Sequence, residues 1–511
     1  MRRARLAALL LALGMVAGAC SVHRLDDSEL STGVDRTGAA AGPASRGADG
    51  AVATSDGNGP SDGTGAGTGP AGGGRTAGAG GAAIDDAPAA RAPTANVTGG
   101  TEARTASDRG VTEDEIRLGI LHTADTFFAA TGSSTKSVDQ VIAPFIAELN
   151  AGGGINGRTV VPRISTYDPL SPDSMKAACV EQAEDHQVFA SIAQVGFYGD
   201  AEICMATKEV PLLTNNNSTA KTNVERERGW VRQTNQNKDR NIKNWIDWMI
   251  DTGLLRPDVR TGVLFVDVPE DRDLMNEVVL PYLRSKGMPS PVVATLSSSI
   301  AQTPAEAQAA VLRFNSERVQ LVLPFVSFLR MLIFTQQADA FSYRPQYSVS
   351  DFGLLATDAM AGMPPSQWEG VTGITVLPTG MDPPGELPSS PAFRECHDAY
   401  RRHGGELAPH PDDPARKDGV EVANMMHYCQ HIALWADVAR RAGLNPTRRS
   451  FLTAVDETGT WSHRVTLSER LTFGPGKLDG ADLYAVVRWQ PRCTSDGGCY
   501  RQIEGFRAGR W

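Results

Sequence analysis

The 511-residue chain carries a formal net charge of −10, which argues against a nucleic-acid-binding protein, because such proteins ordinarily present a basic face. Residues 31–110 contain 60 Gly, Ala, Ser, Thr or Pro residues and no Phe, Trp or Tyr, so this stretch cannot bury enough apolar surface to offset the entropy of ordering it. After residue 20 no apolar run reaches the roughly 18 residues that span a bilayer. We therefore expect a disordered linker followed by a soluble body whose length favours two lobes.

The first twenty residues have the pattern of an export signal. Three arginines within the first five residues precede the apolar run Leu6–Val16, which is too short to be a stable spanning helix. Small residues then lead directly into Cys20, a pattern that resembles the lipobox of bacterial lipoproteins, in which the signal peptidase cuts before the cysteine and its sulfur carries diacylglycerol. We expect lipidation at Cys20 and a disordered tether over residues 21–110. The alternative is a plain secretory peptide that is cleaved near an Ala-x-Ala site.

From residue 113 the chain alternates short apolar strands with amphipathic helices. In the first series we expect strands at 116–121, 159–166, 188–193 and 210–213, and helices at 138–149, 172–185 and 200–207. In the second series we expect strands at 261–267, 292–296, 319–324 and 346–349, and helices at 237–252, 271–286, 304–315 and 328–340. The remaining elements are helices at 392–402, 421–441 and 446–455 and a strand-rich segment at 470–502.

This alternation predicts right-handed βαβ units and mostly parallel sheets, in an α/β fold with two doubly wound Rossmann-like lobes. Because the late helices have no sheet of their own, we expect lobe 1 to comprise residues 111–235 plus 372–465, and lobe 2 to comprise residues 236–371 plus 466–511. Ligands of such folds bind at the carboxyl ends of the strands, in the crevice between the lobes.

Besides Cys20, the body contains six cysteines, an even number that suits an exported protein in an oxidising compartment. Sequence alone leaves their connectivity open. We expect pairing between neighbours: Cys179–Cys204, Cys396–Cys429 and Cys493–Cys499. The last pair is the most secure, because a turn sequence between two strand-like runs separates its cysteines.

A metal site is the rival interpretation of some of these residues. Its candidate ligands are Cys396, His397, His427, Cys429 and His431, with the last two histidines one helical turn apart. No Cys-x-x-Cys spacing accompanies them, and oxidised cysteines cannot ligate zinc, so we expect no metal. The sequence also lacks a Gly-x-Ser-x-Gly elbow, a Walker loop and a His-Glu-x-x-His motif, so we expect neither an enzyme nor a bound cofactor.

Several segments of the body form an ordered set. They are Glu115–Ile120, Glu148–Asn150, Gly152–Arg158, Tyr167-Asp168, Val210–Leu213, Arg232–Thr234, Leu471–Pro475 and Tyr484–Trp489. This set resembles the type 1 periplasmic binding proteins, and specifically their branched-chain amino-acid (Leu/Ile/Val) receptors. The resemblance implies two Rossmann-like lobes, joined by three crossovers, that close on a small ligand like a hinged clamp. It also implies an ABC importer as the partner.

The resemblance further implies a ligand site between the lobes. In the family, hydroxyls and backbone N–H groups of the first lobe hold the ligand's carboxylate, and an acidic side chain of the second lobe holds its ammonium. Carried over by position, Tyr198, Asn216 and Ser218 would hold the polar or anionic end, Asp351 would pair with a cationic group, and Phe127 and Phe325 would supply apolar walls.

Each of these assignments has a structural alternative. Asn216 and Ser218 could form a turn that caps the next helix, Asp351 could be the N-cap of a helix near residue 354, and Phe127 could belong to the core of lobe 1.

The sequence also departs from the family pattern. Phe197 and Tyr198 stand where the family has small hydroxyl residues, the loop after the first strand lacks the family's tryptophan, and Asp125 in that loop would repel an anion. We therefore expect a bulkier or less anionic solute than Leu, Ile or Val.

Together these observations predict a lipid-anchored solute-binding protein on the outer face of the cell membrane. It would capture a small polar or amphipathic ligand, an amino acid or a derivative, for an ABC permease. The alternative is a surface lipoprotein of the same fold that senses a ligand or docks other proteins without a role in transport.

Overall fold

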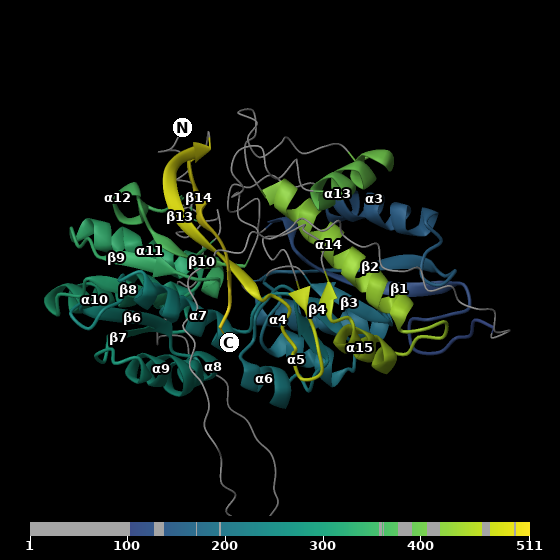
Figure 1. The fold of residues 1–511 in the computed structure, drawn as a ribbon, viewed down its shortest axis with the longest axis horizontal. Helices are drawn as coiled ribbons and strands as arrows, with labels where there is room; N and C mark the ends of the chain where they lie inside the picture. The colour runs from purple at the N-terminus through teal and green to yellow at the C-terminus, as the bar shows by residue number, and fades with distance from the viewer. Residues whose placement is uncertain are drawn as a thin grey trace, which may run out of the picture. The chain divides into compact units, whose positions relative to one another are not determined.

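The computed structural model describes residues 103–126, 137–169, 171–193, 196–356, 360, 362–376, 391–405, 420–461, 471–494 and 497–510. The predicted signal peptide with Cys20, most of the predicted linker and Phe127 lie outside these residues. No helix in the described part of the chain is long and apolar enough to cross a membrane. Within that part the fold is mixed α/β with two main sheets, as the alternation of elements predicts (Figure 1).

The first sheet is parallel and has the strand order β2-β1-β3-β4-β5. Its strands are β1 (Glu115–Thr123), β2 (Thr159–Tyr167), β3 (Ala190–Ala193), β4 (Leu212–Thr214) and β5 (Val231–Gln233). Its helices are α3 (Val138–Ala151), α4 (Pro172–Val180) with a π-helical continuation (Glu181–Asp185), α5 (Asp200–Thr207) and α6 (Ala220–Glu225). All four residues of β3 are buried, as expected for a central parallel strand covered on both faces.

The second sheet has the strand order β14-β13-β10-β9-β8-β6-β7. Its parallel strands are β6 (Thr261–Val266), β7 (Val292–Leu296), β8 (Leu321–Phe325), β9 (Gln346–Val349) and β10 (Thr372–Thr375). An antiparallel hairpin, β13 (Leu483–Thr494) and β14 (Gly497–Ala508), extends the sheet beside β10. Its helices are α7 (Lys238–Asp251), α8 (Pro269–Asp273), α9 (Leu280–Ser285), α10 (Thr303–Ser316), α11 (Phe328–Ala340) and α12 (Pro365–Trp368), with a π-helical segment (Leu274–Val279) between α8 and α9.

Three late helices cover the first sheet, although they follow the second sheet in the chain. They are α13 (Pro391–Arg402), α14 (Val420–Arg441) and α15 (Arg448–Glu457). Both α13 and α14 pack against α3, and α14 also contacts β3 and α15 (Figure 1). Their packing is therefore consistent with the expectation that these late helices, which have no sheet of their own, belong with the first sheet.

The structure differs from the sequence expectations at short elements and at boundaries. Helix α6 and strands β5 and β10 were not predicted, because three to six residues are too few to show a periodicity. Strand β10, which the expected boundary at residue 372 placed in lobe 1, pairs with β9 and β13 in the second sheet. Residues 103–110, which their composition assigned to the linker, are hydrogen-bonded to the body: Thr105 N donates to Asn445 Oδ1 at 2.8 Å, and Ser107 Oγ donates to Pro446 O at 2.7 Å.

The Gly152–Arg158 segment ties the start of the body to the end of α14. The buried Arg158 guanidinium donates to Thr112 O at 2.6 Å, Leu444 O at 2.5 Å and Thr105 O at 3.0 Å. Asn156 donates to Gly443 O at 2.8 Å, just beyond α14. The Gly152–Arg158 segment, which carries much of the family resemblance, therefore has a structural role at the amino edge of the first sheet, where its hydrogen bonds join residues 105–112 to the loop after α14.

Two of the expected cysteine pairs lie at disulfide-bonding distance. Cys179 of α4 faces Cys204 of α5 with Cα atoms 6.3 Å apart, and Cys396 of α13 faces Cys429 of α14 with Cα atoms 5.9 Å apart. Cys499 is also disulfide-bonded, whereas the side chain of Cys493 lies outside the described residues.

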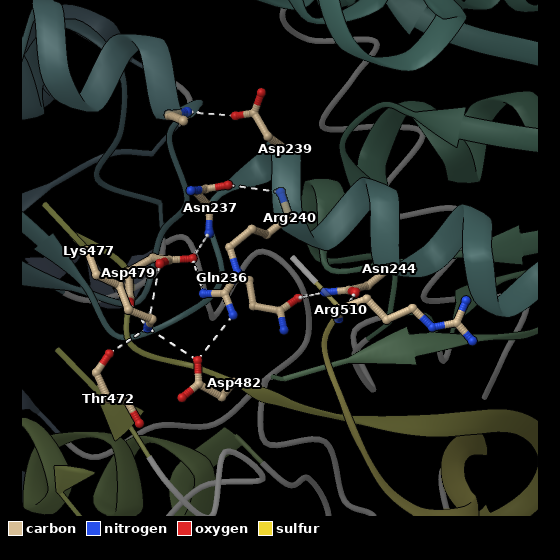
Figure 2. A network of polar contacts seen from close by, with 11 residues as sticks. Gln236, Asn237, Asp239, Arg240, Asn244, Thr472, Lys477, Asp479, Asp482 and Arg510 are labelled. Atoms are coloured by element: carbon tan, nitrogen blue, oxygen red, sulfur yellow. Dashed lines mark hydrogen bonds and ion pairs between the residues drawn. The ribbon is translucent and has the colours of Figure 1, made fainter. Parts of the chain in front are cut away.

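A polar network joins two of the segments that cross between the sheets. One segment runs from β5 into α7, and the other leads from β12 (Leu471–Thr472) into β13. Asp479 accepts hydrogen bonds from Asn237 N at 3.0 Å and from Arg240 Nη1 at 2.6 Å, and Arg240 Nη2 also donates to Asp482 at 3.1 Å (Figure 2). These two crossovers are therefore held side by side by buried or half-buried charges.

Candidate functional site

The candidate site lies where parallel strands of both sheets end, which is where doubly wound folds bind ligands. On the first sheet, Tyr198 follows β3, and Asn216 and Ser218 follow β4. On the second sheet, Phe325 is the last residue of β8, and Asp351 follows β9. The structure thus brings the expected residues to the carboxyl edges of their sheets, although their side chains differ in accessibility.

Tyr198 is the most accessible of the expected residues that the structure describes, since it is 53% exposed. Its hydroxyl lies 3.4 Å from Pro169 O. Partial burial raises the pKa of the Tyr198 phenol, the positive charges of Arg330 and Lys238 lower it, and the negative charges of Asp271 and Asp168 raise it. Arg330, Lys238 and Asp271 come from helices of the second sheet and Asp168 follows β2 of the first, so charges from both sheets act on Tyr198.

Asn216 shapes the loop that carries Tyr198. Its Oδ1 accepts a hydrogen bond from Gly196 N at 3.2 Å, and its Nδ2 donates to Phe197 O. Gly196 has a φ of 100°, in the region that favours glycine. Asn216 therefore fixes a turn that requires glycine at position 196, directly before Tyr198.

Ser218 is buried and bonded within the protein. Its hydroxyl donates to Glu227 Oε1 at 2.5 Å and lies 3.4 Å from Glu202 Oε2. Burial raises the pKa of Glu202 well above its usual range, and the neighbouring Glu227 carboxyl raises it further. Ser218 thus lies between two buried carboxyl groups.

Asp351 and Phe325 are also buried. The Asp351 side chain is 4% exposed and accepts hydrogen bonds from Val376 N at 2.9 Å, Asn241 Nδ2 at 3.0 Å and the Thr375 hydroxyl. Phe325 is fully buried, and its ring makes an edge contact with Trp245 at a centroid distance of 5.5 Å. Asp351 connects β9, β10 and α7, and Phe325 belongs to the core beneath the site.

Three charged residues that the sequence analysis missed, Lys238, Asp271 and Arg330, influence the pKa of Tyr198. Lys238, at the start of α7, forms an ion pair with Glu270 at 2.8 Å, and its Nζ lies 5.5 Å from the centroid of the Phe352 ring. Burial would lower the pKa of Lys238, but Glu270 and Asp271 together raise it above its usual value. The signal that could have revealed these residues is their position in the first turns of helices that directly follow strands: Lys238 comes after β5, Asp271 after β6 and Arg330 after β8.

Asp271 and Arg330 belong to the same set. Burial raises the pKa of the Asp271 carboxyl to about 6, although Lys238 lowers it. Arg330, in the first turn of α11, donates to Ser298 O at 2.6 Å. The same lobe of the site therefore presents both an acidic and a basic side chain.

Behind the first sheet's carboxyl edge lies a buried histidine cluster. His122 Nδ1 lies 2.6 Å from the Tyr428 hydroxyl, and the rings of His427 and His431 lie 4.1 Å apart between centroids. Cys429, one of the metal ligands considered above, is at disulfide distance from Cys396. Among the described residues no group of three or more His, Cys, Asp or Glu side chains could hold a metal ion.

A cavity of about 690 Å³ opens elsewhere, at the amino ends of β8, β9 and β10. Its lining includes Trp248, Gln320, Gln346 and Thr372. Because this is the edge of the sheet opposite to the strand ends that carry Asp351 and Phe325, the cavity is separate from the candidate site.

Residues 115–490 match the model of a protein family described as periplasmic binding protein. The chain resembles a fatty acid ABC transporter substrate-binding protein from Thermomonospora curvata, with 15% identity, a TM-score of 0.58, and coverage of 79% of this chain and 95% of that chain. It resembles a solute binding protein of an ABC transporter from Rhodopseudomonas palustris BisB5, in complex with 3,4-dihydroxy benzoic acid, with 15% identity, a TM-score of 0.54, and coverage of 78% and 98%.

A third similar structure is an ABC transporter substrate-binding protein from Desulfitobacterium hafniense in complex with Leu, with 14% identity, a TM-score of 0.51, and coverage of 76% of this chain and 100% of that chain. At these identities the structural likeness shows the fold alone. No curated protein matches the chain.

Proposed function

Because the chain belongs to the periplasmic binding protein family, we propose that it captures a small polar or amphipathic solute, an amino acid or a derivative, and delivers it to an ABC importer. The observation that carries this proposal is that the loops of Tyr198 in the first sheet and of Asp351 in the second both follow the carboxyl ends of parallel strands. A ligand that touches both lobes favours the closed form by its differential affinity for that form. The similar proteins in complex with Leu and with 3,4-dihydroxy benzoic acid support a small ligand with a carboxyl group.

The expected ligand residues take different parts in this proposal. Tyr198 contacts the solute directly, because its ring is accessible, and Asn216 positions the loop that presents it. Ser218, Asp351 and Phe325 are buried, so they support the residues and loops that contact the solute. Phe127 stays a proposed apolar wall, outside the described residues.

The domain division is also part of the proposal. With β10 assigned to its sheet, the first lobe comprises residues 103–235 and 377–465, and the second comprises residues 236–376 and 466–511. This division keeps α13 and α14, which pack on α3, together with α15, which packs on α14, and leaves the polar network around Asp479 at the hinge (Figure 2).

A thermal-shift screen of the purified protein against amino acids, amides, aromatic acids and fatty acids tests the binding function. A solute present at about 100 times its dissociation constant should add about 2.7 kcal/mol to the free energy of unfolding. Tyr198→Ala should weaken the binding of that solute about tenfold, which corresponds to about 1.4 kcal/mol. The control is Phe341→Ala, because Phe341 is an exposed aromatic at the far end of α11. A normal melting transition with no shift by any solute would favour the alternative of a protein that docks other proteins.

We also propose that the mature protein begins at lipidated Cys20 and is anchored on the outer face of the cell membrane. The support is the run of small residues that precedes Cys20 and the Gly/Ala-rich segment that follows it, which together fit a cleaved lipoprotein signal and a tether. Metabolic labelling with a radioactive fatty acid should mark the wild type and not Cys20→Ala. Equal labelling of the two proteins would contradict the anchor.

A further inference from the structure

The cavity at the amino ends of β8, β9 and β10 lies outside the candidate site. Its volume of about 690 Å³ is in the range of pockets that hold small organic ligands. It is bounded by the end of α7 with the loop that follows it (residues 252–259) and by strands β9, β10, β13 and β14. Because the candidate site lies at the opposite edge of the same sheet, a molecule bound in this cavity would leave that site free.

The floor of the cavity is polar although it belongs to the middle of the sheet. Gln346 begins β9, which is a central strand, and is exposed, whereas the next three residues of β9 are buried. Thr372 begins β10 and lies directly opposite Arg488 of β13, so these two side chains point to the same face of the sheet. All three residues line the cavity. The helices of the second sheet therefore leave this corner of the sheet uncovered.

A β-bulge in β14 supplies two further side chains. Val486 of β13 lies opposite Glu504, and Val487 lies opposite Gln502, so Ile503 is an extra residue in β14. Neighbouring residues of a regular strand point to opposite faces, but a bulge redirects side chains. Ile503 and Glu504 accordingly both line the cavity.

Part of the remaining lining is apolar. Leu254 and Val259 of the loop after α7 and Val319 before β8 contribute to it, as does Trp248 of α7. Trp248 is 3% exposed, and its Nε1 is buried without a hydrogen-bonding partner among the described residues. A ligand in the cavity therefore meets apolar surface as well as the polar floor.

Four charged residues line the cavity, and one of them has no counter-charge. Arg488 is exposed and forms no hydrogen bond or ion pair with any residue that the structure describes. The other three are paired: Arg256 with Asp258 at 3.1 Å, Arg344 with Asp339 at 2.9 Å, and Glu504 with Arg507. The lining thus carries one uncompensated positive charge.

The register of the hairpin places a second positive charge beside the first. Arg501 of β14 lies directly opposite Arg488, and like charges in directly opposite positions destabilise a sheet. An anion at Arg488 offsets this repulsion. One uncompensated charge matches a carboxylate, which carries one negative charge at neutral pH, better than a phosphate monoester, which carries up to two. A guanidinium also binds a carboxylate through two parallel hydrogen bonds.

We propose that this cavity is a second ligand site, which binds a monocarboxylate with an apolar body and holds the carboxylate at Arg488. The apolar body lies against the side chains of Leu254, Val259 and Ile503. This inference goes beyond the proposed capture of a solute for an importer, because it requires neither the candidate site at the carboxyl edges nor an importer.

The test is isothermal titration calorimetry with four probes: octanoate, 1-octanol, octylammonium and acetate. Octanoate has both the charge and the apolar body, and each of the other probes changes one of the two. In the wild type, octanoate should bind at least about tenfold more tightly than each of the other three, because only octanoate pairs with Arg488 and also buries apolar surface.

Arg488→Gln should weaken octanoate about tenfold, to the affinity of 1-octanol. The fold should tolerate this change, since Arg488 is exposed, and an unchanged melting temperature checks this. Ile503→Ser, at another exposed position, should weaken octanoate about fivefold by removing apolar contacts. The matched control is Arg284→Gln, the same substitution at an exposed arginine of α9, which should leave the affinity for octanoate unchanged.

Tyr198→Ala locates the binding event. The binding of octanoate that is lost in Arg488→Gln should persist in Tyr198→Ala, because Tyr198 belongs to the candidate site at the other edge. If Tyr198→Ala weakens octanoate and Arg488→Gln does not, octanoate binds in the candidate site and the inference is overturned while the proposed function stands. Absence of octanoate binding, or binding of 1-octanol or octylammonium as tight as that of octanoate, also overturns the inference without affecting the proposed function.

Discussion

The buried histidine pair on α14 should make the stability of the protein depend on pH. His431 is 1% exposed, its Nδ1 lies 2.9 Å from His427 O, and its Nε2 lies 3.2 Å from Thr234 Oγ1. Burial lowers the pKa of His431 from 6.5 to about 4. Burial also lowers the pKa of His427 well below its usual value, and the neighbouring His431 lowers it further.

The sign of the effect follows from the direction of the shift. The folded protein holds His431 neutral, whereas the unfolded chain takes up a proton as the pH falls below about 6.5, so acid favours the unfolded state. The contribution of His431 is fully present above pH 6.5 and is lost as the pH falls toward 4. A shift of about 2.5 units corresponds to about 3.4 kcal/mol in total, of which about 2.4 kcal/mol is lost between pH 7.0 and pH 4.5.

The assay is urea unfolding of the wild type and of His431→Gln at both pH values. Gln does not titrate, so the difference in unfolding free energy between the two proteins should shift by about 2.4 kcal/mol in favour of the variant on going from pH 7.0 to pH 4.5. The matched control is His397→Gln, the same substitution at a half-buried position on α13, which separates the effect of a His-to-Gln change in itself from that of burial. A wild-type-minus-His431→Gln difference that does not change with pH would refute the reasoning.

Three further predictions concern stability. Arg158→Met should lower the unfolding free energy by about 3–5 kcal/mol in urea unfolding, because it leaves several buried carbonyl groups without donors. A loss below about 1 kcal/mol would show that the Arg158 hydrogen bonds are dispensable. Replacing both Cys179 and Cys204 with Ser should lower the unfolding free energy by about 3 kcal/mol, since the bond closes a loop of 25 residues; reduction of the wild type should lower it further, because it also opens Cys396–Cys429. Glu202→Gln should stabilise the protein at pH 8 relative to the wild type. The reason is that the raised pKa of the Glu202 carboxyl makes the folded wild type lose stability as the pH rises above about 4.5. A difference in melting temperature between variant and wild type that stays the same from pH 5 to pH 8 would contradict this.

Much of the fold could be predicted from the sequence, because long elements impose a periodicity on it. Helices such as α3 and α7 place apolar residues at steps of three and four. Short elements have no such signature, which is why β5, with three residues, and β10, with four, were missed. The partner of β10 also depends on β13, more than 100 residues later in the chain, and a local pattern carries no information about such a pairing.

The candidate site was less predictable than the fold. Position after a strand correctly indicated which loops reach the carboxyl edges, but it did not indicate which side chains remain accessible there. Asp351 and Asp271 both follow strands, yet donors from α7 and from the end of β10 occupy Asp351, whereas Asp271 accepts no hydrogen bond from the described residues. The sequence contains both aspartates, and only the three-dimensional packing distinguishes them.

The late position of α14 has a consequence for how the chain acquires its structure. The strands of the first sheet are all present once Gln233 has been synthesised, but the helix that covers α3 and β3 begins only at Val420. During vectorial synthesis or export, the apolar face of α3 stays exposed while the parallel strands of the second sheet emerge, and such long-range contacts form slowly. Chains that end before residue 420 should therefore be prone to aggregation and degradation even though both sheets have most of their strands.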